Sequence, residues 1–357
     1  MMEQKDQRMS SAQLRSPMVE AEDDLDGIFA EYYKQGWTDG LPIIPPTEAR
    51  VLRMIEASGR SADEVVGVFP PRQAQGTVEQ IAVNAVMAGC LPEYFPVVLA
   101  IAEAMTDSAF DLFSLNTTTN AVAILTVVNG PIRQRIDINC SYGLFGPGWR
   151  ANATIGSAVR LVQLNIAGAL PGPVSKSTHG QPGRYSMCFG EFEEKNPWEP
   201  LHVEQGLTRE ESAVSLFTAQ GTVPITESRT RTAKALIHFI AHCMDIVGTN
   251  NMLPLHPGDS LLVLCPDHAA VIARDGYSKK ALQEALFEKT SRIPISRWPE
   301  EKHEQLLKDR KTTGQFVPLH DSPANFRVIV AGGLGGIHST WVPTYGHSVA
   351  ITRKIKA

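Results

Sequence analysis

The strongest hydrophobic pattern of the chain lies at residues 77–104, TVEQIAVNAVMAGCLPEYFPVVLAIAEA. Apolar residues recur there at helical spacing, and Thr77 with Gln80 three positions later forms the capping-box pattern that begins a helix. Gly89 and Pro92 end this helix, and the following apolar run predicts a second helix with a proline in its first turn. The pattern therefore predicts two helices joined by a short polar elbow, AGCLPEY.

Continuous apolar runs elsewhere predict strands that are covered on both faces. The clearest are 121–128, 259–265 and 326–331. Strands that alternate with periodic helical segments indicate an α/β protein, and we expect mixed sheets covered by helices. The other predicted helices are 24–35, 47–56, 152–166, 230–247, 266–273, 278–288 and 300–308, and the other predicted strands are 185–192, 212–217 and 349–355.

Three segments between these elements carry weaker signals. Ser61–Glu64 predicts the cap of another short helix. Residues 113–120 are expected to form a polar loop, and residues 196–205 an irregular polar turn.

The distribution of Gly, Thr, Asn and Pro predicts the domain organisation. Residues 1–22 are polar and predict a disordered N-terminal tail. Gly, Thr, Asn and Pro accumulate over about 220–258. This loop-forming stretch predicts a boundary between two α/β lobes, one at 23–220 and one at 221–357.

Composition narrows the classes of function. The 357 residues are 43% hydrophobic and 20% charged, with a net charge of −5, so the chain can bury a sizeable core but has no electrostatic basis for binding nucleic acid. No apolar run is long enough to span a membrane, and residues 1–25 lack the apolar core of a signal peptide. Five scattered cysteines do not resemble a disulfide framework, which predicts a reducing, cytoplasmic setting.

The elbow between the two central helices holds the first candidate for chemistry. Cys90, Glu93 and Tyr94 place a thiol, a carboxylate and a phenol within five residues, held by two helices. We expect Cys90 to act as a nucleophile or acid, with Glu93 and Tyr94 as proton-transfer groups. The alternative is that Cys90 is only a small buried hydrophobic residue at a helix crossing.

The glycine-rich segment 332–336, GGLGG, is the second candidate, because it follows a predicted buried strand. Backbone amides of Gly333, Gly335 and Gly336 could approach an anion, and a following helix would add positive potential. The spacing matches no nucleotide-binding motif, so we expect a carboxylate or small polar group and no cofactor. His338, just beyond, is the acid or base candidate. The alternative is a tight strand-to-helix turn without a ligand.

Polar residues of other loops are expected to bind substrate. Asn116 and Asn129 would orient substrate or stabilise an oxyanion, because each lies beside a predicted buried strand. Asp39, Thr118 and Arg150 complete this predicted set, although Asp39 next to a glycine is also ordinary turn chemistry.

A metal site is an alternative that the sequence supports weakly. His202 and Glu204 alternate beside the cluster Glu191–Glu194, and such pairs can supply ligands or acid and base groups. His238 and His242 share a helix face, but no third ligand stands near them in sequence. No zinc signature is present, so we expect no bound metal.

Several long segments resemble a family of bacterial proteins without settled function, associated with the UGSC (seleno)proteins. The similarity rests on WTDGLPIIPPTEARV, TVEQIAVNAVMAGCLPEYFPVVLAIAEA, NGPI, FGPGWRANATIG and PWEPLHVE within about 36–205, and more loosely on Cys265-Pro266-Asp267-His268 and GGLGG. The UGSC motif itself is absent from this chain. The resemblance implies an enzyme, or an enzyme subunit, that acts on small molecules.

These patterns together predict an enzyme that acts on a small polar or anionic molecule by lytic or hydrolytic chemistry, with Cys90 as the working thiol. One alternative is a non-catalytic or partner-requiring subunit of a heteromeric enzyme. The other is a metalloenzyme built on the His202 and Glu204 region. We expect a homo-oligomer, or a hetero-oligomer with a partner subunit.

Overall fold

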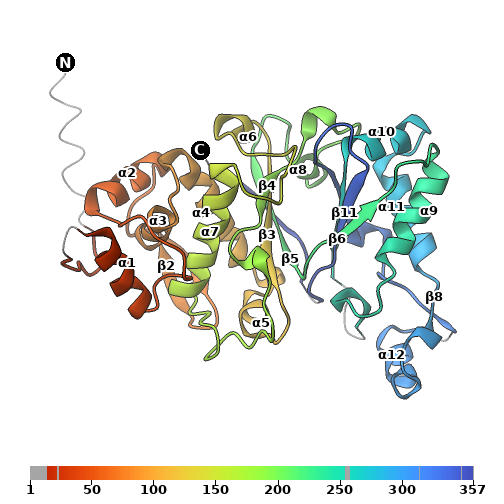
Figure 1. Cartoon of the computed structure of the whole chain (residues 1–357), viewed down its shortest axis with the longest axis horizontal. Helices are drawn as coiled ribbons and strands as arrows, with labels where there is room; N and C mark the ends of the chain where they lie inside the picture. Colours follow the sequence, from red (N-terminus) through yellow and green to blue (C-terminus); the bar gives the residue numbers. More distant parts are fainter. Residues whose placement is uncertain (1–13, 22–23, 254–257, 313, 347, 357) are drawn as a thin grey trace.

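The computed structural model describes residues 14–21, 24–253, 258–312, 314–346 and 348–356. It confirms the predicted fold class: the protein is a mixed α/β protein with two main four-stranded mixed sheets packed against helices (Figure 1). No helix in the described part of the chain is long and apolar enough to cross a membrane.

The first sheet has the strand order β12-β5-β3-β4. Its central strand β3 pairs in parallel with β4 and antiparallel with β5, and β12 pairs antiparallel with β5. The strands are β3 (Ala123–Asn129), β4 (Cys188–Gly190), β5 (Ala213–Ala219) and β12 (Ile351–Lys354).

The second sheet has the strand order β10-β7-β11-β6. Strands β7 and β10 are parallel, whereas β11 runs antiparallel to both β7 and β6. The strands are β6 (Val223–Thr226), β7 (Ser260–Leu264), β10 (Phe326–Val330) and β11 (His338–Val342).

The two sheets pack face to face, with helices on both outer faces (Figure 1). Leu125 of β3 and Val263 of β7 share the core between the sheets, whereas their neighbours Ile124 and Leu262 belong to the two outer cores. This follows from the alternation of side chains along a strand, and it explains why β3 and β7 are apolar on both faces. The result is a four-layer arrangement of helices, sheet, sheet and helices.

The first outer core includes residues of α2 (Glu48–Ser58), α3 (Val78–Met87), α4 (Phe95–Met105) and α7 (Arg150–Asn165). The second includes residues of α9 (Ala233–Met244), α10 (Pro266–Arg274) and α11 (Lys279–Thr290). The remaining α-helices and strands are α1 (Leu25–Lys34), β1 (Val65–Phe69), β2 (Ala74–Thr77), α5 (Leu112–Thr117), α6 (Ile132–Arg135), α8 (Leu201–Glu204), β8 (Ile293–Pro294), α12 (His303–Asp309) and β9 (Phe316–Val317).

The expected boundary near residue 220 falls between β5 and β6, which belong to different sheets. The chain nevertheless crosses back, because β12 near the C-terminus adds an edge strand to the first sheet. Of the expected tail, residues 1–13 and 22 lie outside the described residues. Within the described part, the backbone amides of Arg15 and Ser16 donate to the buried Glu79 carboxylate, at 2.7 Å for Ser16.

Several local predictions were wrong. Ser61–Glu64 does not cap a helix but leads into the β1–β2 hairpin. The segments 113–120 and 196–205 contain α5 and α8. The GGLGG segment is followed by strand β11 rather than by a helix, because the alternating pattern of 338–342 pairs with both β7 and β6.

Candidate functional site

The carboxyl ends of the parallel strands meet at one end of the molecule, where sites of open α/β sheets usually form. Cys265 follows β7, and Gly332 follows the neighbouring strand β10. The end of β4 lies beside them, because the Phe192 amide donates to the Val330 carbonyl at 2.7 Å. Side chains that follow strands of both sheets are therefore grouped at this end.

Cys265 is the N-cap residue of α10, a nine-residue helix with Pro266 in its first position. A helix N-terminus stabilises a negative charge, so this position favours a thiolate. The Cys265 sulfur lies 3.5 Å from the carbonyl oxygen of Gly336 and 3.9 Å from the hydroxyl of Ser339. Cys265 as a whole residue is only 2% exposed.

Ser339 connects the thiol to an imidazole. The Ser339 Oγ lies 2.7 Å from Nδ1 of His268, one turn further along α10, and also accepts the Cys265 backbone amide at 3.2 Å. Nε2 of His268 lies 2.9 Å from the carbonyl oxygen of Glu227. Because a carbonyl only accepts, Nε2 carries a proton and Nδ1 faces the serine. The three side chains form a thiol–hydroxyl–imidazole chain, Cys265–Ser339–His268.

This environment shifts both titrating groups towards an ion pair. Burial alone would raise the pKa of Cys265, but hydrogen bonding to His268 and the imidazolium charge outweigh it and lower the pKa of the thiol. Burial alone would lower the pKa of His268, but its interactions with Cys265 and the Glu227 carbonyl outweigh it and raise the pKa of the imidazole. The pair can therefore exist as thiolate and imidazolium.

The GGLGG segment covers this thiol. The amide of Gly332 donates to the Cys140 carbonyl at 2.9 Å, and the hydroxyl of Tyr142 donates to the Leu334 carbonyl at 3.1 Å. The amide of Gly336, expected to bind an anion, donates instead to the carboxylate of Asp267 at 3.1 Å. The segment therefore lies against the sulfur of Cys265 and helps to bury it.

Sequence reasoning missed this site as a source of chemistry and noted Cys265–His268 only through a loose resemblance. A usable signal was present in the chain: a cysteine directly after a continuous apolar run and before a proline, with a histidine three positions later. Such a cysteine stands at a helix N-terminus, one turn from an imidazole. Ser339, however, is 74 residues away in sequence, and only the pairing of β11 with β7 brings it to Cys265.

The elbow around Cys90 has a different character. The Cys90 thiol is buried and donates to the Thr154 carbonyl at 3.3 Å, and burial raises its pKa to about 12. Burial, with the charge of Glu93, also raises the pKa of Tyr94. The structure does bring Arg150 to this elbow, where it donates to the Gly89 carbonyl at 2.9 Å. A neutral thiol at neutral pH supports the alternative reading of Cys90 as a packed core residue.

His338 lies at the start of β11, and its Nδ1 is 3.0 Å from the hydroxyl of Thr226 on the neighbouring strand β6. Its side chain is exposed, whereas that of Ser339, the next residue, is buried beside Cys265. Since successive side chains of a strand point to opposite faces, the residue that reaches the thiol is Ser339.

Asn129 is buried at the end of β3 in a network of carboxylates. Its amide donates to Glu191 at 2.7 Å and to Glu193 at 3.0 Å, and Arg133 pairs with Glu193 at 3.0 Å. Burial raises the pKa of Glu191, which also accepts the backbone amide of Leu201 at 2.9 Å. These bonds tie the ends of β3 and β4 together, so they hold the end of the first sheet in place.

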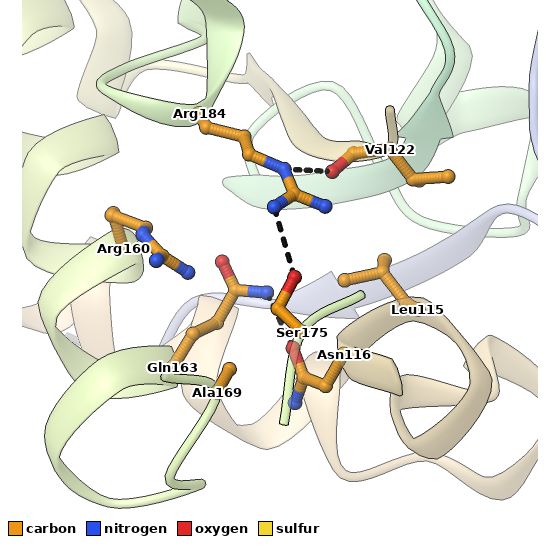
Figure 2. Close-up of a pocket in the computed structure, with 8 residues that line it drawn as sticks. All are labelled: Leu115, Asn116, Val122, Arg160, Gln163, Ala169, Ser175 and Arg184. Carbon is orange, nitrogen blue, oxygen red and sulfur yellow. Dashed lines mark hydrogen bonds between the residues drawn. The ribbon is translucent and has the colours of Figure 1, made fainter. Parts of the chain in front are cut away.

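Asn116 lies at a different location, the pocket in Figure 2, which is lined by residues of α5 and α7 and the segment after α7. The Asn116 Oδ1 accepts Gln163 at 2.9 Å in this pocket. Asp39 interacts with the charge of Arg160, which lines the same pocket. Thr118, two residues beyond Asn116, accepts the amide of Asn120 at 3.1 Å in a local turn.

The residues of the metal alternative lie beside other charged or aromatic side chains, although neither ring nitrogen of His202 has a hydrogen-bond partner among the residues that the structure describes. Glu204 pairs with Lys279 at 2.9 Å, and Nδ1 of the buried His202 lies 4.0 Å from Glu193. The rings of His238 and His242 contact each other, with their centroids 4.4 Å apart. In the described part of the chain, no three His, Cys, Asp or Glu side chains are grouped so that they could hold a metal ion.

Fold and site define the protein as a four-layer α/β protein with a buried thiol–hydroxyl–imidazole chain at the carboxyl ends of its parallel strands. No protein-family model matches the chain, and a search of curated proteins finds no match. The resemblance to UGSC proteins stays a prediction.

Proposed function

We propose that the protein is an enzyme that carries out lytic or hydrolytic chemistry on a small polar molecule, with Cys265 as its nucleophile. The observation that carries this proposal is the contact chain from the Cys265 sulfur through Ser339 to His268, with His268 oriented by the Glu227 carbonyl. An oriented base that activates a nucleophile is the common pattern of covalent catalysis. The proposal moves the catalytic thiol from Cys90 to Cys265.

The proton route follows from the hydrogen bonds. In the neutral state, the Ser339 hydroxyl donates to Nδ1 of His268; in the ion pair, Nδ1 donates to Ser339 and the hydroxyl turns towards the sulfur of Cys265. The thiol proton thus reaches the imidazole through the serine, and the thiolate attacks an electrophilic carbon. His268 then returns the proton to the leaving group by the same route.

The substrate is small, because Cys265 is only 2% exposed beneath the GGLGG segment. Within that segment Gly332 and Gly335 have φ values of 117° and 69°, which only glycine adopts at low cost. Rearrangement of such a segment would open the site and then exclude water again.

A pulse of iodoacetamide across pH 5 to 11, read residue by residue by mass spectrometry, tests the ion pair. Because the pKa of Cys265 is lowered and that of Cys243 is raised by burial, Cys265 should reach half-maximal alkylation rate at a lower pH. His268→Gln should move this midpoint of Cys265 upward and leave that of Cys243 in place. An unchanged midpoint in His268→Gln would contradict the thiolate–imidazolium pair.

A panel of small activated esters tests catalysis itself. We expect a burst of leaving group limited to about one equivalent per chain, an acyl mass adduct on Cys265, and slow turnover, as an acyl-enzyme gives. Cys265→Ala should lose both burst and adduct, whereas the matched variant Cys243→Ala should keep both. An adduct on Cys90 that persists in Cys265→Ala would return the catalytic role to Cys90. A folded protein with no adduct on any cysteine would favour the non-catalytic subunit.

A further inference from the structure

A pocket lies at the other end of β3 from Asn129, away from the thiol of Cys265 (Figure 2). It has a volume of about 210 Å³ including the part that opens to solvent. The polar side chains of its lining are Asn116 of α5, Arg160 and Gln163 of α7, and Ser175 and Arg184 of the segment after α7. We propose that this pocket binds the carboxylate group of a small organic acid, held between Arg160 and Arg184.

Arg160 is the central residue of the proposed site, because it is almost completely buried and its guanidinium makes no hydrogen bond to the described residues. The residue is 9% exposed, lines the pocket, and makes no hydrogen bond or ion pair with any residue that the structure describes. Burial, and then the charge of Arg184, lower the pKa of Arg160 to about 10, while Asp39 acts in the opposite direction. A guanidinium therefore stays charged at neutral pH in a place where a charge without a partner is costly.

Arg184 adds a second cation, and only some of its N–H donors are used in hydrogen bonds to the protein. Its Nε donates to the Val122 carbonyl at 2.8 Å and its Nη1 to the Ser175 hydroxyl at 3.1 Å. These two bonds fix the guanidinium, which has five N–H donors, in the pocket wall. Figure 2 shows the guanidinium groups of Arg160 and Arg184 converging on the side chain of Gln163. Two arginines that face one space repel each other unless an anion lies between them.

The protein itself does not supply that anion as an ion pair. Asp39 is the acidic residue that acts on Arg160, yet no carboxylate lies within ion-pair distance of Arg160 among the described residues. The neutral amide side chains of the pocket lining already have hydrogen-bond partners in the protein. Gln163 donates to Asn116 at 2.9 Å, and Asn116 donates to the Pro70 carbonyl at 2.8 Å. The cation of Arg160 is thus the unmatched part of an otherwise paired wall.

The size of the pocket and the planar shape of the guanidinium indicate which class of ligand would bind. The enclosed part of the pocket is narrow, so it excludes a tetrahedral phosphate and leaves room for at most the flat end of a carboxylate. A guanidinium presents parallel N–H donors that match a planar carboxylate. The remainder of a small acid would extend into the part of the pocket that opens to solvent. This site does not depend on the proposed chemistry of Cys265.

Thermal unfolding of the whole chain tests the proposal, with sodium formate or acetate compared with sodium chloride at equal ionic strength. At ligand concentrations about 100-fold above Kd, a bound carboxylate should raise the Tm of the wild type by roughly 3 to 4 °C over chloride. Arg160→Met should abolish the difference, because it removes the cation and keeps a side chain of similar length. Arg53→Met, on an exposed residue of α2, should keep the difference.

A second variant covers the possibility that Arg160→Met does not fold. Arg160→Lys keeps the charge but loses the planar fork, and it should raise the carboxylate concentration for half-maximal effect about tenfold. If chloride raises the Tm of the wild type as much as formate or acetate does, the site does not select carboxylates. No shift in the wild type, or the same shift in Arg160→Met, would overturn the site.

Discussion

The hydroxyl of Tyr142 donates a hydrogen bond of 3.1 Å to the carbonyl oxygen of Leu334, in the middle of the glycine-rich segment that covers Cys265. The ring of Tyr142 also fills the space beside Gly333, where an added Cβ would lie 2.1 Å from the ring. Two residues far apart in sequence therefore meet at the segment that covers the thiol.

Loss of this contact should make Cys265 more accessible. One hydrogen bond contributes about 1 kcal/mol net, so Tyr142→Phe should raise the alkylation rate of Cys265 about fivefold. Tyr142→Ala, which also removes the ring from Gly333, should raise it further. Site-resolved mass spectrometry after iodoacetamide measures both rates.

Tyr185→Ala is the matched control for that experiment, because Tyr185 is 51% exposed and lies outside the glycine-rich segment. Its alkylation rate at Cys265 should equal that of the wild type. If Tyr142→Ala also leaves the rate unchanged, the segment 332–336 does not limit access to the thiol.

The capping box at the start of α3 allows a direct comparison of two N-caps. The Thr77 hydroxyl accepts the Gln80 amide at 3.3 Å and the Gln80 side chain accepts the Thr77 amide at 3.1 Å, whereas Thr47 caps α2 without a side-chain hydrogen bond. Thr77→Ala should therefore lower the free energy of unfolding by about 1 kcal/mol, and Thr47→Ala by clearly less. Urea denaturation measures both, and equal losses would show that the hydrogen bonds of the box add nothing.

This capping box is also an example of what the sequence could predict. Both halves of the motif lie within four residues, so local spacing was sufficient, and the predicted helix begins where the structure has it. The apolar runs of β3 and β7 were equally informative, because burial on both faces leaves no polar alternation. The turn from β10 into β11 was mistaken for a strand-to-helix connection, since the run of glycines hides which element follows.

The candidate site was harder to predict, because its members come from distant segments. Cys265 and His268 are neighbours on α10, but Ser339 and the Glu227 carbonyl reach them only through the pairing of β11 with β7 and β6. Cys90 looked reactive because polar residues surround it in sequence. Its burial, which raises the pKa of the thiol to about 12, depends on packing against α7 and is not visible in the sequence.

A buried histidine of the second sheet predicts how stability depends on pH. His320 is fully buried, its Nε2 lies 2.7 Å from the hydroxyl of Ser260, and its ring contacts Phe326. Burial, followed by the charge of Arg310, lowers the pKa of His320 to about 3, although the Gly258 carbonyl acts in the opposite direction. The ordinary value in an unfolded chain is about 6.5.

Proton binding by His320 in the unfolded chain makes the free energy of unfolding depend on pH. Between these two pKa values the unfolded chain holds a proton on His320 that the folded protein lacks, so the free energy of unfolding must fall as the pH falls. From about pH 5.5 to 4 this one group should contribute a slope of about 1.4 kcal/mol per pH unit. His320→Gln, which cannot titrate, should be less stable at pH 7 through altered packing but should lose this part of the slope. Urea denaturation at several pH values, with the exposed His242→Gln as the control that keeps the wild-type slope, measures it. If the slopes of His320→Gln and the wild type are parallel, then His320 is protonated in the folded protein and the imidazole is not buried as described.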